Sequence, residues 1–448
     1  MVRIDIDARV DRIQQPENML FSQLTAMQQE ICKAAGCSEQ WYSYGIVESP
    51  FPVPDEMIHE SCSPLVHGKY SHPAGMPELR NAVSGFYARH YNVSVPPERI
   101  IIGHGVKGLI FPLFTLLNGS VVVPTPGWLG YLPQLRILNK PYYRLYCHRS
   151  ANYKIRPVQL AGLLKGLVKT EHLLILNNPG YPTGILYTRK ELEEIADICR
   201  TYNTVILANE AYSLLTYDQT RFVSMGSVYP EGTFVLNGLS MDRGAGGYRI
   251  GTCIMPEGST EKIIREFVKI LATIYTAAAT PAQQAAIAAY EPNASMDAFL
   301  HDTREIHRIM TVRLASICAG IEGVTTVIPE GGFSFMADLS SITTALQAAG
   351  IQYSNDLAPA LIRHPYHIAT VSGESMMGAY SDFFIRFSVT DYNGKQALAD
   401  FRKNPPVNEA EEELFFTKFG GRMIEGIEMF RRWIQDLQDG KIRYHKEG

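Results

Sequence analysis

Residues 173–212 read LLILNNPGYPTGILYTRKELEEIADICRTYNTVILANEAY, and this stretch predicts the architecture of the chain. Leu173–Leu176 and Val205–Ala208 are continuously apolar, which is the pattern of strands that are covered on both faces. Between them, Thr188–Tyr202 begins with a capping box and continues with one apolar stripe, so it predicts a helix. A strand, a helix and a strand in succession indicate a parallel sheet flanked by helices.

The same alternation extends outward on both sides of this stretch. Further strands are predicted at Ile100–Gly103, Val121–Val123, Tyr142–Cys147 and Thr233–Leu236. The fold class is therefore α/β, with a mostly parallel sheet. In such sheets ligands bind at the carboxyl ends of the strands.

The two ends of the chain differ from the middle, and 448 residues suggest two or three domains. We expect a large domain over 46–299 and a smaller α+β domain built from 1–45 and 300–448. The smaller domain has a helical pattern over Glu291–Gly320 and a Gly-rich strand around Gly331–Asp338. Near the end, Lys403–Glu412 is predicted to be a surface loop and Arg422–Leu437 an amphipathic helix.

Composition and charge exclude several classes of function. The chain has 41 Lys and Arg against 45 Asp and Glu, so its net charge of −4 makes nucleic acid or an anionic membrane a poor partner. No apolar run approaches about 18 residues, and the first residues lack the apolar core of a secretory signal. Seven scattered cysteines without a CxxC pair predict no metal site and favour a reducing cytoplasm.

Polar and glycine-rich turns follow the predicted strands. Gly105, Val106 and Lys107 open a helix directly after a strand, and the backbone N–H groups of such a helix start favour a phosphate. The stretch after Thr233–Leu236 combines flexible glycines with Ser240 and Arg249. This combination suits an anion.

Taken in this order and spacing, the motifs resemble those of the fold-type-I pyridoxal-phosphate-dependent aminotransferases of class I and II. The resemblance runs from about Gly45 to Thr390, and its motifs include PTG at Pro182–Gly184 and RxG at Arg249–Gly251. It implies pyridoxal 5′-phosphate as the cofactor and a homodimer that binds an amino acid or keto acid.

The resemblance also implies roles for particular residues. Arg386 and the segment around Gly45 would bind the substrate, with the Arg386 guanidinium clamping its α-carboxylate. Thr280 lies where the family also reaches across the dimer interface. The Glu210/Tyr212 pair also falls where the family has it, and Tyr212 is implied both as a cofactor contact and, with position 241, as a catalytic residue. The other implied cofactor contacts are a phosphate turn at Gly105, Val106 and Lys107, the stacking aromatic Trp128, the anion ligands Ser240 and Arg249, and Tyr70 reaching the phosphate of the neighbouring subunit.

Three positions depart from the family pattern. Met241 stands where the family has the Schiff-base lysine, which holds the cofactor and carries a proton, and a thioether can do neither. Asn209 replaces the carboxylate that pairs with the pyridine nitrogen, and Tyr181 replaces the asparagine that bonds the ring oxygen. A neutral amide cannot keep that nitrogen protonated. Gly238 also stands where the family often has a phosphate-binding hydroxyl.

Ordinary transamination is therefore expected to be impaired. The cofactor would be held non-covalently or as its imine with an amino acid, the external aldimine, and no other lysine is an evident replacement. Three hypotheses stay open: an active aminotransferase captured as a Lys→Met variant at 241, a divergent enzyme with other pyridoxal-phosphate chemistry, and a non-catalytic relative that binds a ligand or partner.

Overall fold

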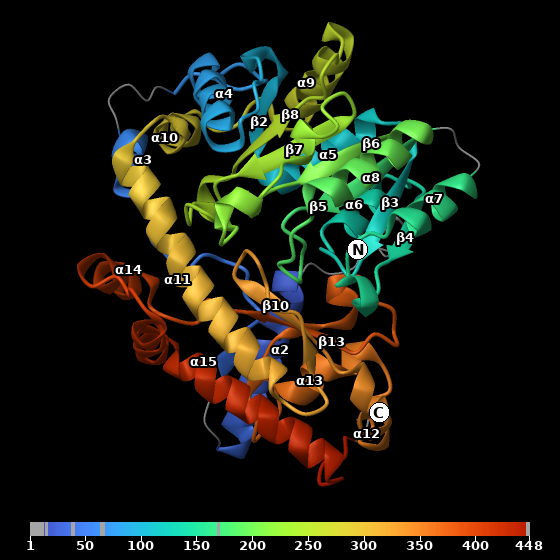
Figure 1. Ribbon diagram of the computed structural model, residues 1–448, viewed down its shortest axis with the longest axis vertical. Helices are drawn as coiled ribbons and strands as arrows, with labels where there is room; N and C mark the ends of the chain where they lie inside the picture. Colours follow the sequence, from blue (N-terminus) through green and yellow to red (C-terminus); the bar gives the residue numbers. More distant parts are fainter. Residues whose placement is uncertain (1–12, 14–16, 37–40, 63–67, 168–170, 445–448) are drawn as a thin grey trace, which may run out of the picture.

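The computed structural model describes residues 13, 17–36, 41–62, 68–167 and 171–444 (Figure 1). Its largest sheet has the strand order β2-β8-β7-β6-β5-β3-β4. In this sheet β8 runs antiparallel to both of its neighbours, while the other pairs are parallel. The predicted mostly parallel α/β sheet is thus confirmed. The strands are β2 (Ile100–His104), β3 (Ser120–Thr125), β4 (Tyr142–Tyr146), β5 (His172–Asn177), β6 (Thr204–Asn209), β7 (Thr233–Gly238) and β8 (Ile250–Ile254).

Helices cover both faces of this sheet, which explains why its strands are continuously apolar. Successive side chains of β5 point to opposite faces. Leu173 and Ile175 belong to one buried cluster, and Leu174 and Leu176 belong to another on the opposite face. The flanking helices are α4 (Pro77–Tyr91), α5 (Gly105–Leu116), α6 (Tyr131–Ile137), α7 (Pro157–Lys165), α8 (Arg189–Thr201), α9 (Glu261–Tyr275) and α10 (Thr280–Tyr290).

Helix α8 forms as its sequence predicts. The Thr188 hydroxyl accepts a hydrogen bond from the backbone N–H of Glu191, and the Glu191 carboxylate accepts one from the backbone N–H of Thr188. This reciprocal cap satisfies two N–H groups that a helix start otherwise leaves without partners. The apolar stripe, with Leu192, Ile195 and Cys199, is buried against the sheet.

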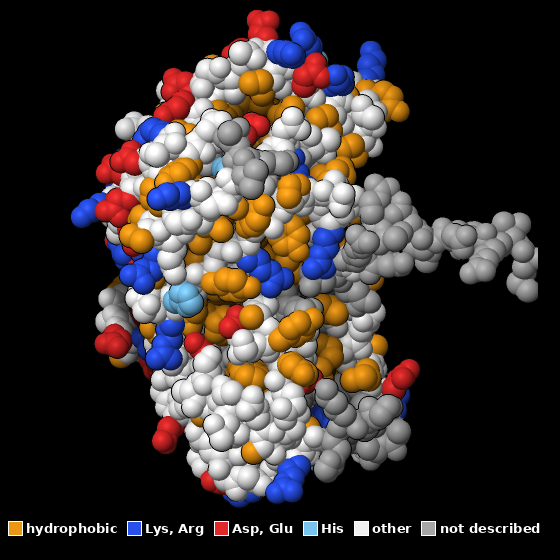
Figure 2. Space-filling model, turned by 90° about the vertical axis from the view of Figure 1, so that its right-hand side faces the viewer, with side chains coloured by type: hydrophobic (Ala, Val, Ile, Leu, Met, Phe, Trp, Pro, Cys, Tyr) orange, Lys and Arg blue, Asp and Glu red, His pale blue; other side chains and the backbone are white. Residues whose placement is uncertain are grey.

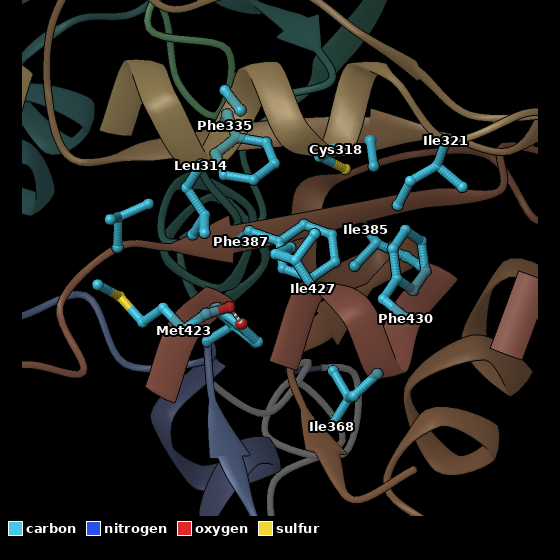
Figure 3. Packing of buried hydrophobic residues seen from close by; sticks show 14 of the residues in the cluster. Leu314, Cys318, Ile321, Phe335, Ile368, Ile385, Phe387, Met423, Ile427 and Phe430 are labelled. Carbon is cyan, nitrogen blue, oxygen red and sulfur yellow. Dashed lines mark hydrogen bonds between the residues drawn. The ribbon is translucent and has the colours of Figure 1, made fainter. Parts of the chain in front are cut away.

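A second, four-stranded sheet has the order β12-β13-β10-β9. It packs with the long helices α11 (Ala294–Ala319) and α15 (Glu409–Gln438), which also contact each other, and Figure 3 shows side chains of the sheet and of both helices meeting in one core. This core also contains Tyr44 and Phe51 from the beginning of the chain. The division into 46–299 and 1–45 with 300–448 stays a prediction. The strands are β9 (Thr325–Thr326), β10 (Ser334–Asp338), β12 (Val371–Ser372) and β13 (Phe384–Ser388).

The remaining elements are short or peripheral. A two-stranded parallel sheet joins β1 (Tyr42–Ser43) to β11 (Ile368–Ala369). The other helices are α2 (Glu17–Ala35), α3 (Asp55–Ser61), α12 (Thr343–Ala348), α13 (Leu357–Leu361) and α14 (Gly394–Lys403).

One prediction about the C-terminal region is wrong. The expected loop Lys403–Glu412 is only partly a loop, because α15 already begins at Glu409. The Asn408 side chain caps this helix, and Glu412 forms ion pairs with Arg308 and Arg313 of α11. A run of acidic residues that looks like a loop in the sequence is therefore stabilised as a first helical turn by cations on another helix.

Two features of the structure concern the prediction that membranes and nucleic acids are poor partners. None of the helices in the described parts of the chain is long and apolar enough to cross a membrane. On the face shown in Figure 2, Lys and Arg side chains are interspersed with acidic and hydrophobic ones and do not gather in one basic patch.

Candidate active site

The predicted phosphate turn lies where α5 begins, directly after β2. Gly105 is the first residue of the helix and has a φ of +69°, which favours glycine. A Cβ at Gly105 would lie 2.4 Å from a terminal guanidinium nitrogen of Arg249. The structure therefore brings the helix start and the arginine together, although they are far apart in the sequence. Backbone N–H groups and a guanidinium at one place form a suitable cradle for a phosphate.

Arg249 is itself held in position by its own loop. It has a φ of +56°, and its Nη1 donates a hydrogen bond of 2.8 Å to the carbonyl oxygen of Gly246. A Cβ on Gly251 would lie 2.4 Å from the carbonyl carbon of Gly105. The glycine of the RxG motif thus lets β8 approach the phosphate turn closely.

A pocket of about 410 Å³ borders this turn. His104 lines it from the end of β2, and Tyr248 and Arg249 line it from the loop before β8. The remaining lining residues are Ser61, Gly247, Ala279, Pro281 and Ala282. No group of three or more His, Cys, Asp or Glu side chains placed to hold a metal ion is found in the described parts of the chain.

Trp128 lies on the turn after β3 and is half-buried. Its ring meets the ring of Tyr131 edge to face, with centroids 5.1 Å apart. The Nζ of Lys107, from the phosphate turn, lies 5.2 Å from the centroid of the Trp128 ring. Two residues that the sequence assigns to the cofactor site, Lys107 and Trp128, are therefore neighbours.

Tyr131 is a site residue that the sequence reasoning missed. Its hydroxyl donates a 2.7 Å hydrogen bond to the Oδ1 of Asn177 and accepts a 2.9 Å hydrogen bond from the Nδ2 of Asn209. Burial raises the pKa of Tyr131 above its ordinary value, so the hydroxyl keeps its proton. The only signal in the sequence was its position three residues after Trp128.

This network explains the amide at position 209. The single hydroxyl proton of Tyr131 is used on Asn177, so the hydroxyl oxygen needs a donor from its other neighbour. The amide of Asn209 supplies that donor, whereas a carboxylate would not. Asn209 is thus part of a matched set of buried polar groups.

Met241 lies in the loop after β7, half-buried beside Ser240. The next two residues anchor it, because Asp242 and Arg243 form a fully buried ion pair of 2.6 Å. Arg243 also donates to the carbonyl oxygen of Ala289 at 3.1 Å. Position 241 is therefore held on a rigid loop.

The residues of the predicted Glu210–Tyr212 motif have different environments. Glu210 is fully buried and accepts hydrogen bonds from the Ser224 hydroxyl and the Met225 backbone N–H. Its burial raises its pKa to about 8, so the carboxyl is mostly protonated at neutral pH. Tyr212 is half-buried, and its ring contacts Phe333 edge to face at 5.5 Å between centroids.

Arg386 lies on β13 and is completely buried. Its Nη1 donates a hydrogen bond to the hydroxyl of Tyr181, and its Nη2 donates one of 2.7 Å to the carbonyl oxygen of Gly45. The structure thus joins the two residues assigned to the substrate, Arg386 and Gly45, and adds Tyr181 from the cofactor set.

Tyr70 stands apart from the other site residues. Its side chain is 87% exposed in the single chain. The Thr280 hydroxyl donates a 3.0 Å hydrogen bond to the carbonyl oxygen of Lys69, the residue before Tyr70. The loop that bears Tyr70 is therefore attached to the start of α10 within the same chain.

Comparisons with known proteins agree with this fold. The family model described as "Aminotransferase class I and II" matches residues 66–400. An aspartate aminotransferase of Bacillus subtilis is 28% identical over 361 residues, covering 78% of this chain and 87% of that protein. An asparagine–oxo-acid transaminase of Streptococcus mutans is 28% identical over 339 residues, covering 73% of this chain and 81% of that protein.

Solved structures show the same fold. Aspartate aminotransferase from Thermus thermophilus with maleate superimposes with a TM-score of 0.76 at 22% identity, covering 96% of this chain and all of that one. At this identity the likeness concerns the fold alone. The family match supports pyridoxal phosphate as the cofactor expected from the sequence.

Proposed function

Because the chain belongs to the class I and II aminotransferase family, we propose that it binds pyridoxal phosphate without a covalent bond at residue 241 and acts on an α-amino acid. It is a pyridoxal-phosphate-dependent transferase by family. The finer part of the proposal is that the cofactor is held by its phosphate and its ring, and that ordinary transamination is slow.

The observation that carries the proposal is the meeting of Gly105 and Arg249 at the start of α5. The residues present fit a phosphate. Gly105 has no side chain, and a Cβ there would occupy the space beside the Arg249 guanidinium. The N–H groups of the first turn of α5 and the guanidinium of Arg249 would hold the phosphate. Trp128 would orient the ring by stacking.

The bound cofactor would supply an electron sink for the bonds at the substrate α-carbon. The residues of this chain limit that chemistry in two ways. Met241 has no basic nitrogen with which to move a proton at the α-carbon. Asn209 is neutral and turned toward Tyr131, so it adds no negative charge beside the ring nitrogen.

Among the open hypotheses, the hydrogen bonds favour a divergent enzyme. A replacement of lysine by methionine at 241 alone would not explain why positions 209 and 181 also depart from the family pattern. Asn209 has a matched partner in Tyr131, and Tyr181 has one in Arg386. The trapped aminotransferase and the non-catalytic relative remain as alternatives that binding and restoration experiments separate.

The experiment is a titration with pyridoxal phosphate, in which binding is measured by equilibrium dialysis and by the quenching of tryptophan fluorescence. Wild-type protein should bind the cofactor, and Arg249→Ala should weaken binding by at least about tenfold, because it removes a charge-assisted contact. Arg432→Ala, an exposed arginine on α15, is the matched control and should bind like wild type. Equal binding by all three proteins, or no uptake, contradicts the proposal.

We also propose a homodimer in which Tyr70 serves the neighbouring subunit. An aromatic side chain that is 87% exposed supports this role, since large exposed aromatics are frequent at interfaces. Sedimentation equilibrium should give twice the chain mass of 50.0 kDa. A mass near that of one chain would mean that the protein is a monomer, and Tyr70 could then not contribute to the site of a neighbouring subunit. The cytoplasmic location stays a prediction.

A further inference from the structure

The guanidinium of Arg386 already has an oxygen partner at each of its two terminal nitrogens. One is the phenolic oxygen of Tyr181, and the other is the carbonyl oxygen of Gly45 at 2.7 Å. The guanidinium carbon also lies 5.7 Å from the centroid of the Tyr181 ring. Two oxygens on the two ends of a guanidinium are what a bidentate carboxylate would offer.

Rigid elements hold these three groups together. Arg386 is paired with Met336 of β10 and Val371 of β12 within the smaller sheet. Tyr181 lies in a closed turn, where the backbone N–H of Gly184 donates to the carbonyl oxygen of Gly180 at 2.7 Å. The contact between Tyr181 and Arg386 therefore belongs to the folded framework.

The burial of Arg386 determines the energetics of this contact. A guanidinium that is 0% exposed must have hydrogen-bond partners, because an unpaired buried charge is strongly destabilising. Tyr181 supplies a neutral partner that costs no second charge. An incoming carboxylate has to displace the Tyr181 hydroxyl before its own charge-assisted bonds form, and the Arg386 guanidinium then loses its contact with the Tyr181 ring.

We infer that Tyr181 is a specificity-determining residue that occupies the carboxylate side of Arg386, so that an α-carboxylate adds little affinity at this site compared with an amine that lacks one. This inference rests on the proposed function, because it concerns the substrate that the cofactor-loaded site accepts. It predicts that the site binds an amine and the matching amino acid with similar affinity, although it retains the arginine.

Two stable ligands test the inference without turnover. Reduction of pyridoxal phosphate with alanine or with ethylamine gives secondary amines that differ only in the carboxylate, and isothermal titration calorimetry measures the Kd of each. In wild type the two values should agree within about threefold. In Tyr181→Phe the alanine adduct should bind at least about tenfold more tightly, because the displaced hydroxyl is gone, while the ethylamine adduct should change little.

Two further variants guard against a folding effect. Tyr181→Asn places the shorter family residue at this position and should shift the ratio in the same direction as Tyr181→Phe. Tyr229→Phe removes a hydroxyl that bonds the carbonyl oxygen of Thr204 at 3.2 Å, and it should leave the ratio at the wild-type value.

The outcomes separate the inference from the proposed function. If wild type binds both adducts but prefers the alanine adduct by more than about threefold, or if Tyr181→Phe leaves the wild-type ratio unchanged, the inference is overturned and the proposed function stands. If wild type binds neither adduct nor pyridoxal phosphate, both are overturned.

Discussion

The amide of Asn209 donates a hydrogen bond of 2.9 Å to the hydroxyl of Tyr131, which in turn donates to Asn177. Asn209 and Asn177 are the last residues of the neighbouring strands β6 and β5, and Tyr131 is the first residue of α6, which follows the next strand of the sheet, β3. The relationship gives position 209 a local structural reason to carry an amide. It also shows how a change beside the proposed cofactor site is coupled to its neighbours.

The first prediction concerns this network. Asn209→Asp removes the donor that Tyr131 needs, so we expect the free energy of unfolding to fall by about 1–3 kcal/mol. Urea denaturation of a double-mutant cycle with Tyr131→Phe measures the coupling. The aspartate should cost less in the phenylalanine background, and an equal cost in both backgrounds would refute the proposed coupling.

Restoring the amine at position 241 is the second prediction. Met241→Lys should attach pyridoxal phosphate covalently, and borohydride reduction followed by peptide mass spectrometry should place the modification on residue 241. Wild type treated in the same way should carry no label there. The wild-type methionine has no amine that could react, so it serves as the control. If the Met241→Lys variant also stays unlabelled, position 241 does not face the cofactor.

Activity of the same variant separates the hypotheses about origin. We expect Met241→Lys to remain slow in exchange between an amino acid and a keto acid, because Asn209 and Tyr181 are unchanged. Brisk exchange would instead identify an aminotransferase captured by a single substitution. The assay is amino-group transfer monitored with a coupled dehydrogenase.

The third prediction is a pH dependence of stability that comes from Glu210. Burial raises its folded-state pKa from the ordinary 4.5 to about 8. Between these two values the folded state holds a proton that the unfolded chain releases. The free energy of unfolding should therefore fall as the pH rises from about 5 to about 8, by about 1 kcal/mol for each pH unit.

Glu210→Gln should remove this slope while keeping a similar shape and polarity. Urea midpoints at several pH values between 5 and 8 test it, with Glu231→Gln as a control at an exposed carboxylate whose pKa is lowered. A variant with the same slope as wild type would show that Glu210 is not the titrating group.

The fourth prediction compares a buried ion pair with an exposed one. Asp242→Asn should destabilise the protein by about 3–5 kcal/mol, because it leaves the buried guanidinium of Arg243 without a counter-charge. Glu231→Gln breaks the exposed pair with Arg200 and should cost at most about 1 kcal/mol. Thermal and urea unfolding measure both, and similar costs would contradict the role assigned to burial.

The sequence by itself determined the local structure and the family. The apolar runs of β5 and β6 and the capping box of α8 depend on neighbouring residues, so their patterns predict them well. The same is true of the glycine that opens α5. The motifs after the strands could also be assembled into one site, because parallel strands bring their carboxyl ends to the same edge.

Only the tertiary structure decided which side chains touch. The start of α15 at Glu409 depends on arginines of α11 about a hundred residues away in the sequence. Tyr131 meets Asn209, and Tyr181 meets Arg386, across 78 and 205 residues respectively. Sequence patterns report the period and polarity of a segment, whereas a hydrogen bond between segments depends on how sheets and helices pack. The altered residues could thus be seen in the sequence, but their partners could be identified only in the folded chain.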